Sequence, residues 1–171
     1  GSPAFDVAAG FTCAAYDNGK ALKAFAEAVD VITYEFENVP VDTVEFLEKL
    51  KPVRPGAKAL RTAQDRLLEK DLAQTLGTAT APFAPVNSRA DLDAAIANIG
   101  LPAILKTNRF GYDGKGQAKI RHASAADAAW AAMRGQPAIL EGFVNFDCEM
   151  SVIAARSPDG SFAAFDVTAN E

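Results

Sequence analysis

The sequence predicts an α/β and α+β fold built in two successive parts, and three observations support this. Short runs of β-branched and aromatic residues alternate with alanine-rich segments of helical period. A proline-containing stretch at 78–85 separates two such alternating regions. In the second region, a glycine-rich segment at 108–116 connects two predicted strands instead of preceding a helix.

The first part is predicted to alternate strands and helices with short connections, an order that favours parallel pairing. Its strands combine apolar, β-branched and aromatic residues, and its helices carry apolar residues at helical spacing. Gly77 follows the last of these helices and is a suitable residue to end it. The strands are expected at 11–14 and 31–36, and the helices at 19–29, after Pro40 and over most of 56–76.

The second part is predicted to contain more strands than helices. Two helices are expected after Ser88 and Ser124, because each serine precedes an acidic residue at capping spacing. Asp159 and Gly160 form a hairpin-turn signal between the last two strands. The strands are expected at 83–87, where an edge strand is predicted, and at 103–107, 117–120, 138–144, 148–156 and 162–167.

Composition and charge exclude several classes of protein. The chain has 171 residues and a net charge of -5, which does not fit a nucleic-acid-binding surface. It contains neither an apolar run of membrane-spanning length nor a signal peptide. His122 is the single histidine, which argues against a histidine-based zinc site. Cys13 and Cys148 show no metal-ligand spacing and are expected to be buried, reduced thiols of a cytoplasmic protein.

The segment around Lys106 carries the strongest chemical signal. Lys106 lies inside an apolar strand, where a lysine is costly unless an anion compensates its charge. The glycine-rich segment that follows contains a second lysine, Lys115. Glycines let backbone N–H groups approach phosphate oxygens, and lysines neutralise those oxygens as point charges. The combination predicts a bound polyphosphate, although a hairpin turn and a lysine that reaches solvent explain each feature taken alone.

A second candidate segment is the apolar strand that ends at 141–144. Its last residues, Glu141, Gly142, Phe143 and Val144, can offer backbone groups to an adenine edge. Glu149 follows, and its carboxylate can accept hydrogen bonds from ribose hydroxyls. Surface strands often carry glutamates, so this interpretation depends on the rest of the pattern.

Together these segments resemble the ATP-grasp superfamily, and within it the carboxyaminoimidazole ribonucleotide synthetase family. The string GYDGKGQ after Lys106 is the most specific of the matches, and the string YEFENVP is the second. The order of the matches holds along nearly the whole chain. They are residues 33–40 (TYEFENVP), 54–56 (RPG), 63–70 (AQDRLLEK), 80–83 (TAPF), 110–117 (FGYDGKGQ), 141–144 (EGFV) and Glu149.

The resemblance implies an ATP-dependent carbon–nitrogen ligase of purine biosynthesis. Such an enzyme converts ATP and bicarbonate to carboxyphosphate, and then transfers the carboxyl group to the exocyclic amine of 5-aminoimidazole ribonucleotide. The implied cofactors are ATP and Mg²⁺, the implied assembly of the parent protein is a homodimer, and its place is the cytoplasm. Neither nucleic acid nor a membrane is an expected partner.

The resemblance also implies roles for individual residues. Lys106 and Lys115 would be the catalytic cations, with Lys106 on the α- and β-phosphates. Arg66 would contact the nucleotide, 141–144 would line the adenine pocket, and Glu149 would bind the ribose. The segment that closes over the triphosphate would consist of Gly111, Tyr112, Asp113, Gly114, Lys115, Gly116 and Gln117.

The sequence also departs from the family pattern. The family's initial strand and glycine-rich turn are absent, and family members continue well past residue 171. We therefore expect a catalytically incomplete fragment with no metal ligands of its own. The expected division is a partial Rossmann-like pre-ATP-grasp domain at 1–77, the small ATP-grasp lid subdomain at 78–160, and a truncated start of the large subdomain at 161–171.

Two alternatives remain open from the sequence. One is a different ATP-grasp ligase or carboxylase, such as a formate-dependent glycinamide ribonucleotide transformylase or a biotin carboxylase, against which the YEFENVP string argues. The other is a non-catalytic nucleotide-binding module.

Overall fold

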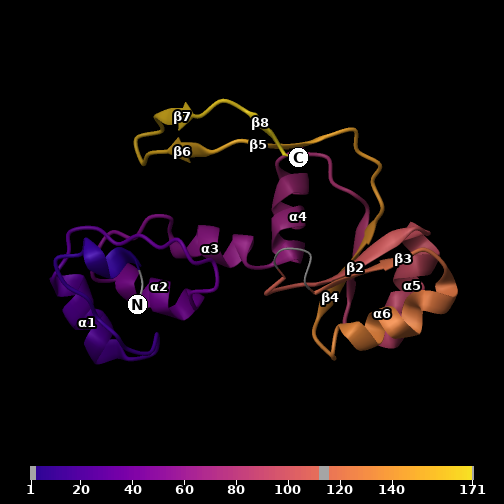
Figure 1. The fold of residues 1–171 in the computed structure, drawn as a ribbon, viewed down its shortest axis with the longest axis horizontal. Helices are drawn as coiled ribbons and strands as arrows, with labels where there is room; N and C mark the ends of the chain where they lie inside the picture. Colours follow the sequence, from indigo (N-terminus) through magenta and orange to yellow (C-terminus); the bar gives the residue numbers. More distant parts are fainter. Residues whose placement is uncertain (1–2, 112–115, 171) are drawn as a thin grey trace.

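The computed structural model describes residues 3–111 and 116–170. Its helices and strands form two bodies joined through α4, and a long hairpin at the end of the chain extends away from both (Figure 1). The first body begins with a short 3-10 helix, η1 (Pro3–Asp6). It continues with α1 (Gly19–Glu27), α2 (Val41–Glu48) and α3 (Ala57–Ala63). Their buried apolar residues form one core: Ala26, Ile32, Val39, Val44, Leu47, Val53, Ala57 and Leu60.

The two strands predicted in the first body are wrong as strands. Residues 11–14 are irregular and exposed, and 31–36 contains only an isolated parallel bridge between Ile32 and Val53. A β-strand is stabilised by neighbours that take up its backbone hydrogen bonds. Among the described residues, Ile32 finds such a neighbour only in the segment around Val53, whose backbone it joins on both sides. The predicted parallel pairing in the first body is therefore confirmed only at the bridge between Ile32 and Val53.

The helical segment predicted over 56–76 consists of two helices, α3 and α4 (Arg66–Thr75). The break lies at Asp65, whose backbone is extended and whose carboxylate accepts from the amides of Leu67 and Leu68. This is an N-cap, so a new helix starts there. At the other end, Gly77 has a φ of +77°, and its amide and that of Thr78 bond back to the last turn. Gly77 ends the helix, as predicted.

The second body contains a four-stranded antiparallel sheet in the order β1-β4-β2-β3. The predicted edge strand is confirmed, since β1 lies at one edge of this sheet. The predicted strands at 103–107 and 117–120 are confirmed with the same bounds. The strands are β1 (Phe83–Val86), β2 (Ala103–Thr107), β3 (Gln117–Ile120) and β4 (Ala138–Gly142).

Helices α5 (Arg89–Ile99) and α6 (Ala126–Ala132) pack on one face of this sheet. Ser88 caps α5 as predicted, because its hydroxyl accepts from the Asp91 amide. Ser124 does not cap α6, because it lies inside a short 3-10 helix, η2 (Ala123–Ala125), that runs directly into α6. The shared core consists mainly of Val86, Leu92, Leu105, Ile120, Met133 and Leu140.

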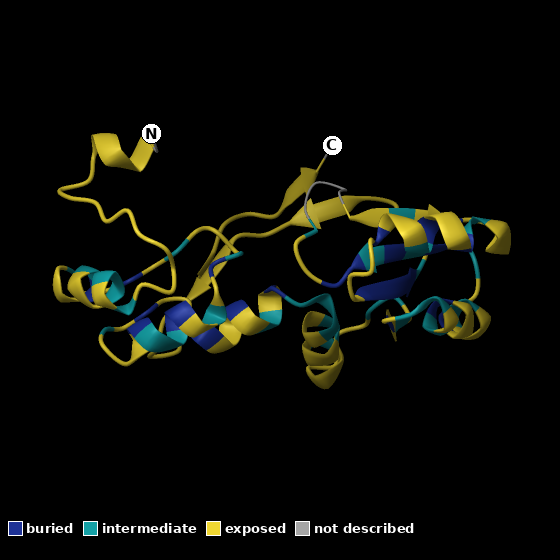
Figure 2. Ribbon diagram, turned by 90° about the horizontal axis from the view of Figure 1, so that it is seen from below, coloured by how far each residue is buried: buried dark blue, intermediate teal, exposed yellow. Residues whose placement is uncertain are grey.

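The last part of the chain is one long hairpin that is exposed over its whole length (Figure 2). The turn predicted at Asp159 and Gly160 is confirmed, with a φ of +90° at Gly160. The strand predicted at 148–156 is split in two by a break in the pairing, and the strand predicted at 162–167 ends at 164, with a further strand beginning at 168. The strands are β5 (Glu149–Ser151), β6 (Ala154–Arg156), β7 (Phe162–Ala164) and β8 (Thr168–Asn170).

The split has a geometric cause. The pair Ser151–Thr168 closes one ladder, and the pair Ala154–Ala164 opens the next. Two residues on one side therefore face three on the other, which is a β-bulge that shifts the register by one residue. The hairpin remains continuous, because the amide of Phe165 donates to the Ile153 carbonyl at 2.9 Å across the bulge.

Two further observations concern the whole described chain. Cys13 and Cys148 are free and exposed, so the prediction of buried thiols is wrong. One lies in the irregular first segment and the other just before the exposed hairpin, and neither segment packs into a core. No helix in residues 3–111 and 116–170 has the length and apolar character needed to cross a membrane.

Candidate functional site

The sheet of the second body has one face that carries charged side chains. Side chains alternate between faces along a strand, so residues in register lie on the same side. Leu105 and Leu140 point into the core with α5 and α6. Lys106 and Gln117 are paired across β2 and β3, and Ile104 is paired with both Lys119 and Glu141. Two lysines and a glutamate from three adjacent strands therefore share the face opposite the helices.

Lys106 and Glu141 form the centre of this charged face. The Lys106 ammonium lies 2.6 Å from Oε2 of Glu141, a diagonal contact between β2 and β4. The Lys70 ammonium, from α4, lies 3.2 Å from Oε1 of the same carboxylate. The Glu141 side chain is only 10% exposed, and the two lysine side chains are 22% and 19% exposed. One buried carboxylate is thus shared by two ammonium groups.

The two lysines determine the ionisation of Glu141. Burial alone would raise the pKa of its carboxyl group, because it disfavours the charged form. The hydrogen bonds and positive charges of Lys106 and Lys70 outweigh burial, and the pKa of Glu141 is lowered. The nearby Glu69 behaves oppositely: burial raises its pKa, and Arg66 opposes this only in part.

Arg66 is bound to the backbone at the base of the glycine-rich segment. Its Nε donates to the Thr107 carbonyl at 3.2 Å, and one terminal nitrogen donates to the Gly111 carbonyl at 3.4 Å. Its backbone amide donates to the Asn108 carbonyl at 3.1 Å. Asn108 in turn donates to the capping carboxylate of Asp65 at 2.8 Å. The start of α4 is therefore fastened to the end of β2.

A second set of contacts ties this junction to the first body. Gln64 is buried, and its amide nitrogen donates to the carbonyls of Glu37 and Val39. Its amide oxygen accepts from the Arg109 guanidinium. Phe110 follows with a φ of +62°, an unusual backbone conformation for a residue other than glycine. These contacts place residues 108–111, where the glycine-rich segment begins, at the border between the two bodies.

Gly116 is required by its local geometry. Its φ is +69°, and its carbonyl accepts from the Thr107 amide at 2.8 Å. A Cβ atom added at Gly116 would lie 2.6 Å from Oγ1 of Thr107, which is a steric clash. Both the backbone conformation and the close approach to β2 therefore favour glycine.

We expect Gly116→Ala to lower the free energy of unfolding by about 2 kcal/mol, since a left-handed conformation alone costs about 1–2 kcal/mol outside glycine. Chemical denaturation measures this loss. The Gly116→Ala/Thr107→Ala double variant should recover only the part due to the clash. Full recovery in that double variant would show that the backbone conformation contributes nothing.

The segment predicted to meet adenine begins at the end of β4. The Gly142 amide donates to the Pro82 carbonyl at 2.8 Å, and the Phe143 amide donates to the Pro102 carbonyl at 3.1 Å. Among the described residues, the Phe143 carbonyl and the Val144 amide have no hydrogen-bond partner. The Lys119 ammonium stacks 3.5 Å from the centre of the Phe143 ring.

The remaining predicted site residues lie elsewhere. Glu149 is in the exposed hairpin, where its carboxylate accepts from the Asn170 side chain at 2.9 Å, and it makes no described contact with Lys106 or Glu141. Tyr112, Asp113, Gly114 and Lys115 lie outside the described residues. Lys70 was missed by the sequence reasoning. Its position one helical turn after Arg66, on the same face of α4, is the signal that could have found it.

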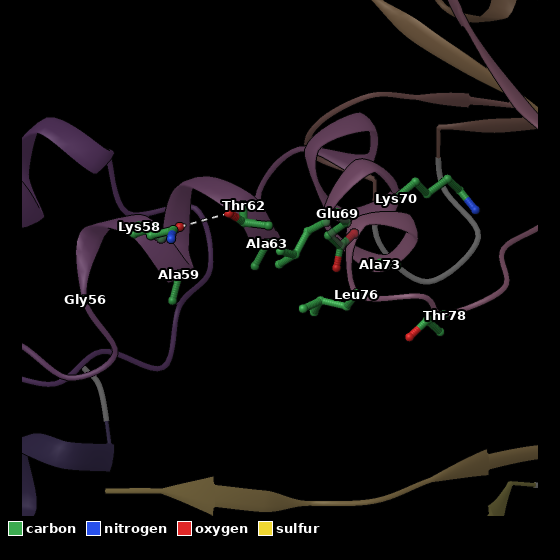
Figure 3. A pocket seen from close by; sticks show the side chains of 11 residues that line it. Gly56, Lys58, Ala59, Thr62, Ala63, Glu69, Lys70, Ala73, Leu76 and Thr78 are labelled. Carbon is green, nitrogen blue, oxygen red and sulfur yellow. Dashed lines mark hydrogen bonds between the residues drawn. The ribbon is translucent and has the colours of Figure 1, made fainter. Parts of the chain in front are cut away.

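A pocket of about 910 Å³ opens between α3 and α4 (Figure 3). Lys70 is at its edge and extends from α4 on the side away from α3. The pocket therefore borders the charged face through this lysine. The lining is mostly apolar: Gly56, Lys58, Ala59, Thr62, Ala63, Glu69, Lys70, Leu72, Ala73, Leu76 and Thr78.

Carboxylate clusters that could hold a metal ion are not found in residues 3–111 and 116–170. The carboxylate beside Lys106 is engaged by lysines instead. The described residues of this site thus fit an anion better than a divalent cation.

Comparison with known proteins agrees with this geometry. The family described as the ATP-grasp domain matches residues 71–171, and the ribonucleotide synthetase preATP-grasp domain matches residues 1–64. The first match covers more than half of the chain, so the chain belongs to the ATP-grasp family. The predicted α/β class with a pre-ATP-grasp part followed by an ATP-grasp part is thereby confirmed.

The individual relatives point to one kind of enzyme within the ATP-grasp family. N5-carboxyaminoimidazole ribonucleotide synthases from Pseudomonas aeruginosa and Brucella melitensis are each 47% identical, over 91% and 99% of this chain. The chain spans only 43% and 48% of their lengths. A crystal structure of the ADP complex of such a synthetase matches with a TM-score of 0.94 and 38% identity, over 99% of this chain and 45% of that chain. The predicted resemblance to this family is confirmed.

Proposed function

We propose that this chain forms the ATP-binding part of an N5-carboxyaminoimidazole ribonucleotide synthetase. The observation that carries the proposal is the cationic face of the sheet, with Lys106 and Lys119 on adjacent strands and Lys70 above them. Positive side chains on an open sheet face suit a polyphosphate. The similarity to synthases of this class, one of them crystallised with ADP, supports the same interpretation.

In this proposal the phosphates lie along Lys106. Its ammonium would bind the α- and β-phosphates as a point charge. The backbone N–H groups of Gly111 and Gly116, with Gln117, would approach the triphosphate from the glycine-rich segment. Tyr112, Asp113, Gly114 and Lys115 belong to the same segment of the sequence, and Lys115 would supply a second cation. Arg66 would act on the nucleotide indirectly, because its guanidinium binds the backbone carbonyls of Thr107 and Gly111 at the start of this segment.

The adenine would lie at the end of β4. The Val144 amide is a donor without a partner among the described residues, and it can donate to a ring nitrogen of adenine. The Phe143 ring, with Lys119 on it, and Gly142 would flank the base. Glu141, in β4, would form the side of this adenine pocket that faces the sheet. Glu149 would bind the ribose, which requires the hairpin to approach the sheet more closely than its present contacts do.

The reaction that we propose for the whole protein has two steps. A bicarbonate oxygen attacks the γ-phosphorus of ATP, which gives carboxyphosphate and ADP. The exocyclic amine of 5-aminoimidazole ribonucleotide then attacks the carboxyl carbon, phosphate leaves, and the amine loses a proton. The chain's own residues bind the nucleotide, offset the charge that develops on the leaving ADP, and help to exclude water from carboxyphosphate.

Mg²⁺ would supply further neutralisation of the phosphates in this reaction. The carboxylates described here do not form a site for it, so we assign it no ligand in this chain. The domain division at 77 and 160, a homodimeric parent protein and a cytoplasmic location are parts of the same proposal.

Calorimetric titration with ATP and with GTP, each with and without Mg²⁺, tests the nucleotide assignment. We expect saturable binding of ATP and weaker binding of GTP, because the Val144 amide can donate to N1 of adenine, whereas N1 of guanine carries a hydrogen. A second assay supplies the remaining half of the Pseudomonas relative in trans and follows phosphate release. Release that depends on both bicarbonate and 5-aminoimidazole ribonucleotide would support the ligase. Binding of neither nucleotide, with no release, would refute the proposal for this chain.

A further inference from the structure

The carboxylate of Glu141 has two lysine partners, one on each oxygen. Lys106 lies 2.6 Å from Oε2, and Lys70 lies 3.2 Å from Oε1. Either ammonium alone would compensate the negative charge. A buried carboxylate left with no cation is costly, and breaking such a pair destabilises more than forming it stabilises. The second lysine adds to this compensation, and it also leaves Glu141 with a partner if the first lysine moves away.

Lys106 is the partner that has a reason to leave. In the proposed function its ammonium binds the α- and β-phosphates, which draws it away from Oε2. Its side chain is 22% exposed, so it has room to move toward the open face of the sheet. Glu141 cannot follow it into water, because its side chain is only 10% exposed and belongs to a central strand.

Lys70 is held where it can remain. It lies one helical turn after Arg66 on the same face of α4. Arg66 and Asp65 fasten this end of the helix to the backbone and side chain of residues 107–111. The Phe83 ring, which is paired with Glu141 across β1 and β4, lies 5.6 Å from the Lys70 ammonium. A helix anchor and an aromatic ring thus keep Lys70 beside Oε1.

We propose that Lys70 is a positioning residue that remains the counter-ion of Glu141 while Lys106 exchanges this carboxylate for the phosphates of the nucleotide. This inference deepens the proposed function and rests on it. Lys70 itself touches no phosphate. It keeps Glu141 ionised and in place, so that the end of β4 stays in register for the adenine and Lys106 is free to bind.

Nucleotide affinity in four variants tests this role. We expect Lys70→Met to weaken ATP binding by about 10- to 100-fold, because binding would then leave Glu141 unpaired. Lys70→Arg should restore most of the affinity. Glu141→Gln removes the charge that needs a partner, so the Lys70→Met/Glu141→Gln double variant should bind ATP as Glu141→Gln does. If Lys70→Met weakens binding just as much when combined with Glu141→Gln, Lys70 binds the nucleotide directly and the inference is wrong.

A measurement without nucleotide separates this inference from the proposed function. Thermal unfolding is followed for Lys70→Met, Lys106→Met and the double variant, each with Glu141 intact and each combined with Glu141→Gln. We expect the double variant to lose more than the sum of the single losses, and the excess to vanish when position 141 is neutral. Additive losses would overturn the shared-carboxylate arrangement. Failure of the wild-type chain to bind ATP, with the excess present, would overturn the proposed function and with it the phosphate exchange.

Discussion

Lys106→Ala is expected to weaken ATP binding by about 10- to 100-fold, since a hydrogen bond to a charged group contributes about 1.5–3 kcal/mol. The lysine extends from the central part of the sheet, so its ammonium is already directed to the face that would receive the phosphates. An alanine removes that charge while Glu141 keeps Lys70 as its partner. The loss should therefore appear in affinity rather than in folding.

Calorimetry on Lys106→Ala, with thermal unfolding beside it, measures both quantities. Lys49→Ala is the matched control, because Lys49 is an exposed lysine at the end of α2 in the other body. The control should bind ATP like the wild type. Equal affinity of Lys106→Ala and the wild type would remove Lys106 from the nucleotide site.

The sequence predicted the second body better than the first, for a physical reason. In β2, buried and half-buried residues alternate. The glycine-rich segment marks the end of β2 and the start of β3, so local sequence patterns are sufficient to predict both strands. At 11–14 and 31–36 the residues favour strands equally well, but a strand depends on its neighbours. Only the segment around Val53 pairs with Ile32 among the described residues. Local propensity cannot supply a missing partner.

The same distinction applies to the site. Lys106 was predicted because a charged residue inside an apolar strand is conspicuous in a sequence. Glu141 was predicted for adenine, but its side chain forms the ion pair with Lys106, a contact that depends on the order β4-β2 in the sheet. Lys70 comes from a helix and meets Glu141 only through tertiary packing. Arg66 was predicted to contact the nucleotide, and its described contacts are backbone carbonyls.

Glu141→Ala should cost about 2–4 kcal/mol of unfolding free energy. Removing one member of a buried ion pair costs about 3–5 kcal/mol, and we reduce this because Lys106 and Lys70 can still reach water. Urea denaturation measures the loss. Glu45→Ala is the matched control: it breaks the exposed pair with Arg61, which should cost less than about 1 kcal/mol. Equal losses in the two variants would mean that the Glu141 carboxylate contributes no more than a surface charge.

The acid sensitivity of the chain should depend on the same carboxylate. The folded pKa of Glu141 lies below its ordinary value of 4.5, so folding favours the ionised form. This contribution is complete above pH 4.5 and is lost as the pH falls through the lower folded pKa. Glu69 has the opposite effect on stability, because its folded pKa is raised. As the pH falls toward 4.5, Glu69 is protonated in the folded state first, and this removes the destabilisation due to its charge. Glu141→Gln should therefore flatten the loss of stability below pH 4.5 and leave the region above it unchanged. A wild-type slope that persists below that pH in Glu141→Gln would assign the acid sensitivity to other carboxylates, and the buried pair with Lys106 and Lys70 would then contribute little to folding.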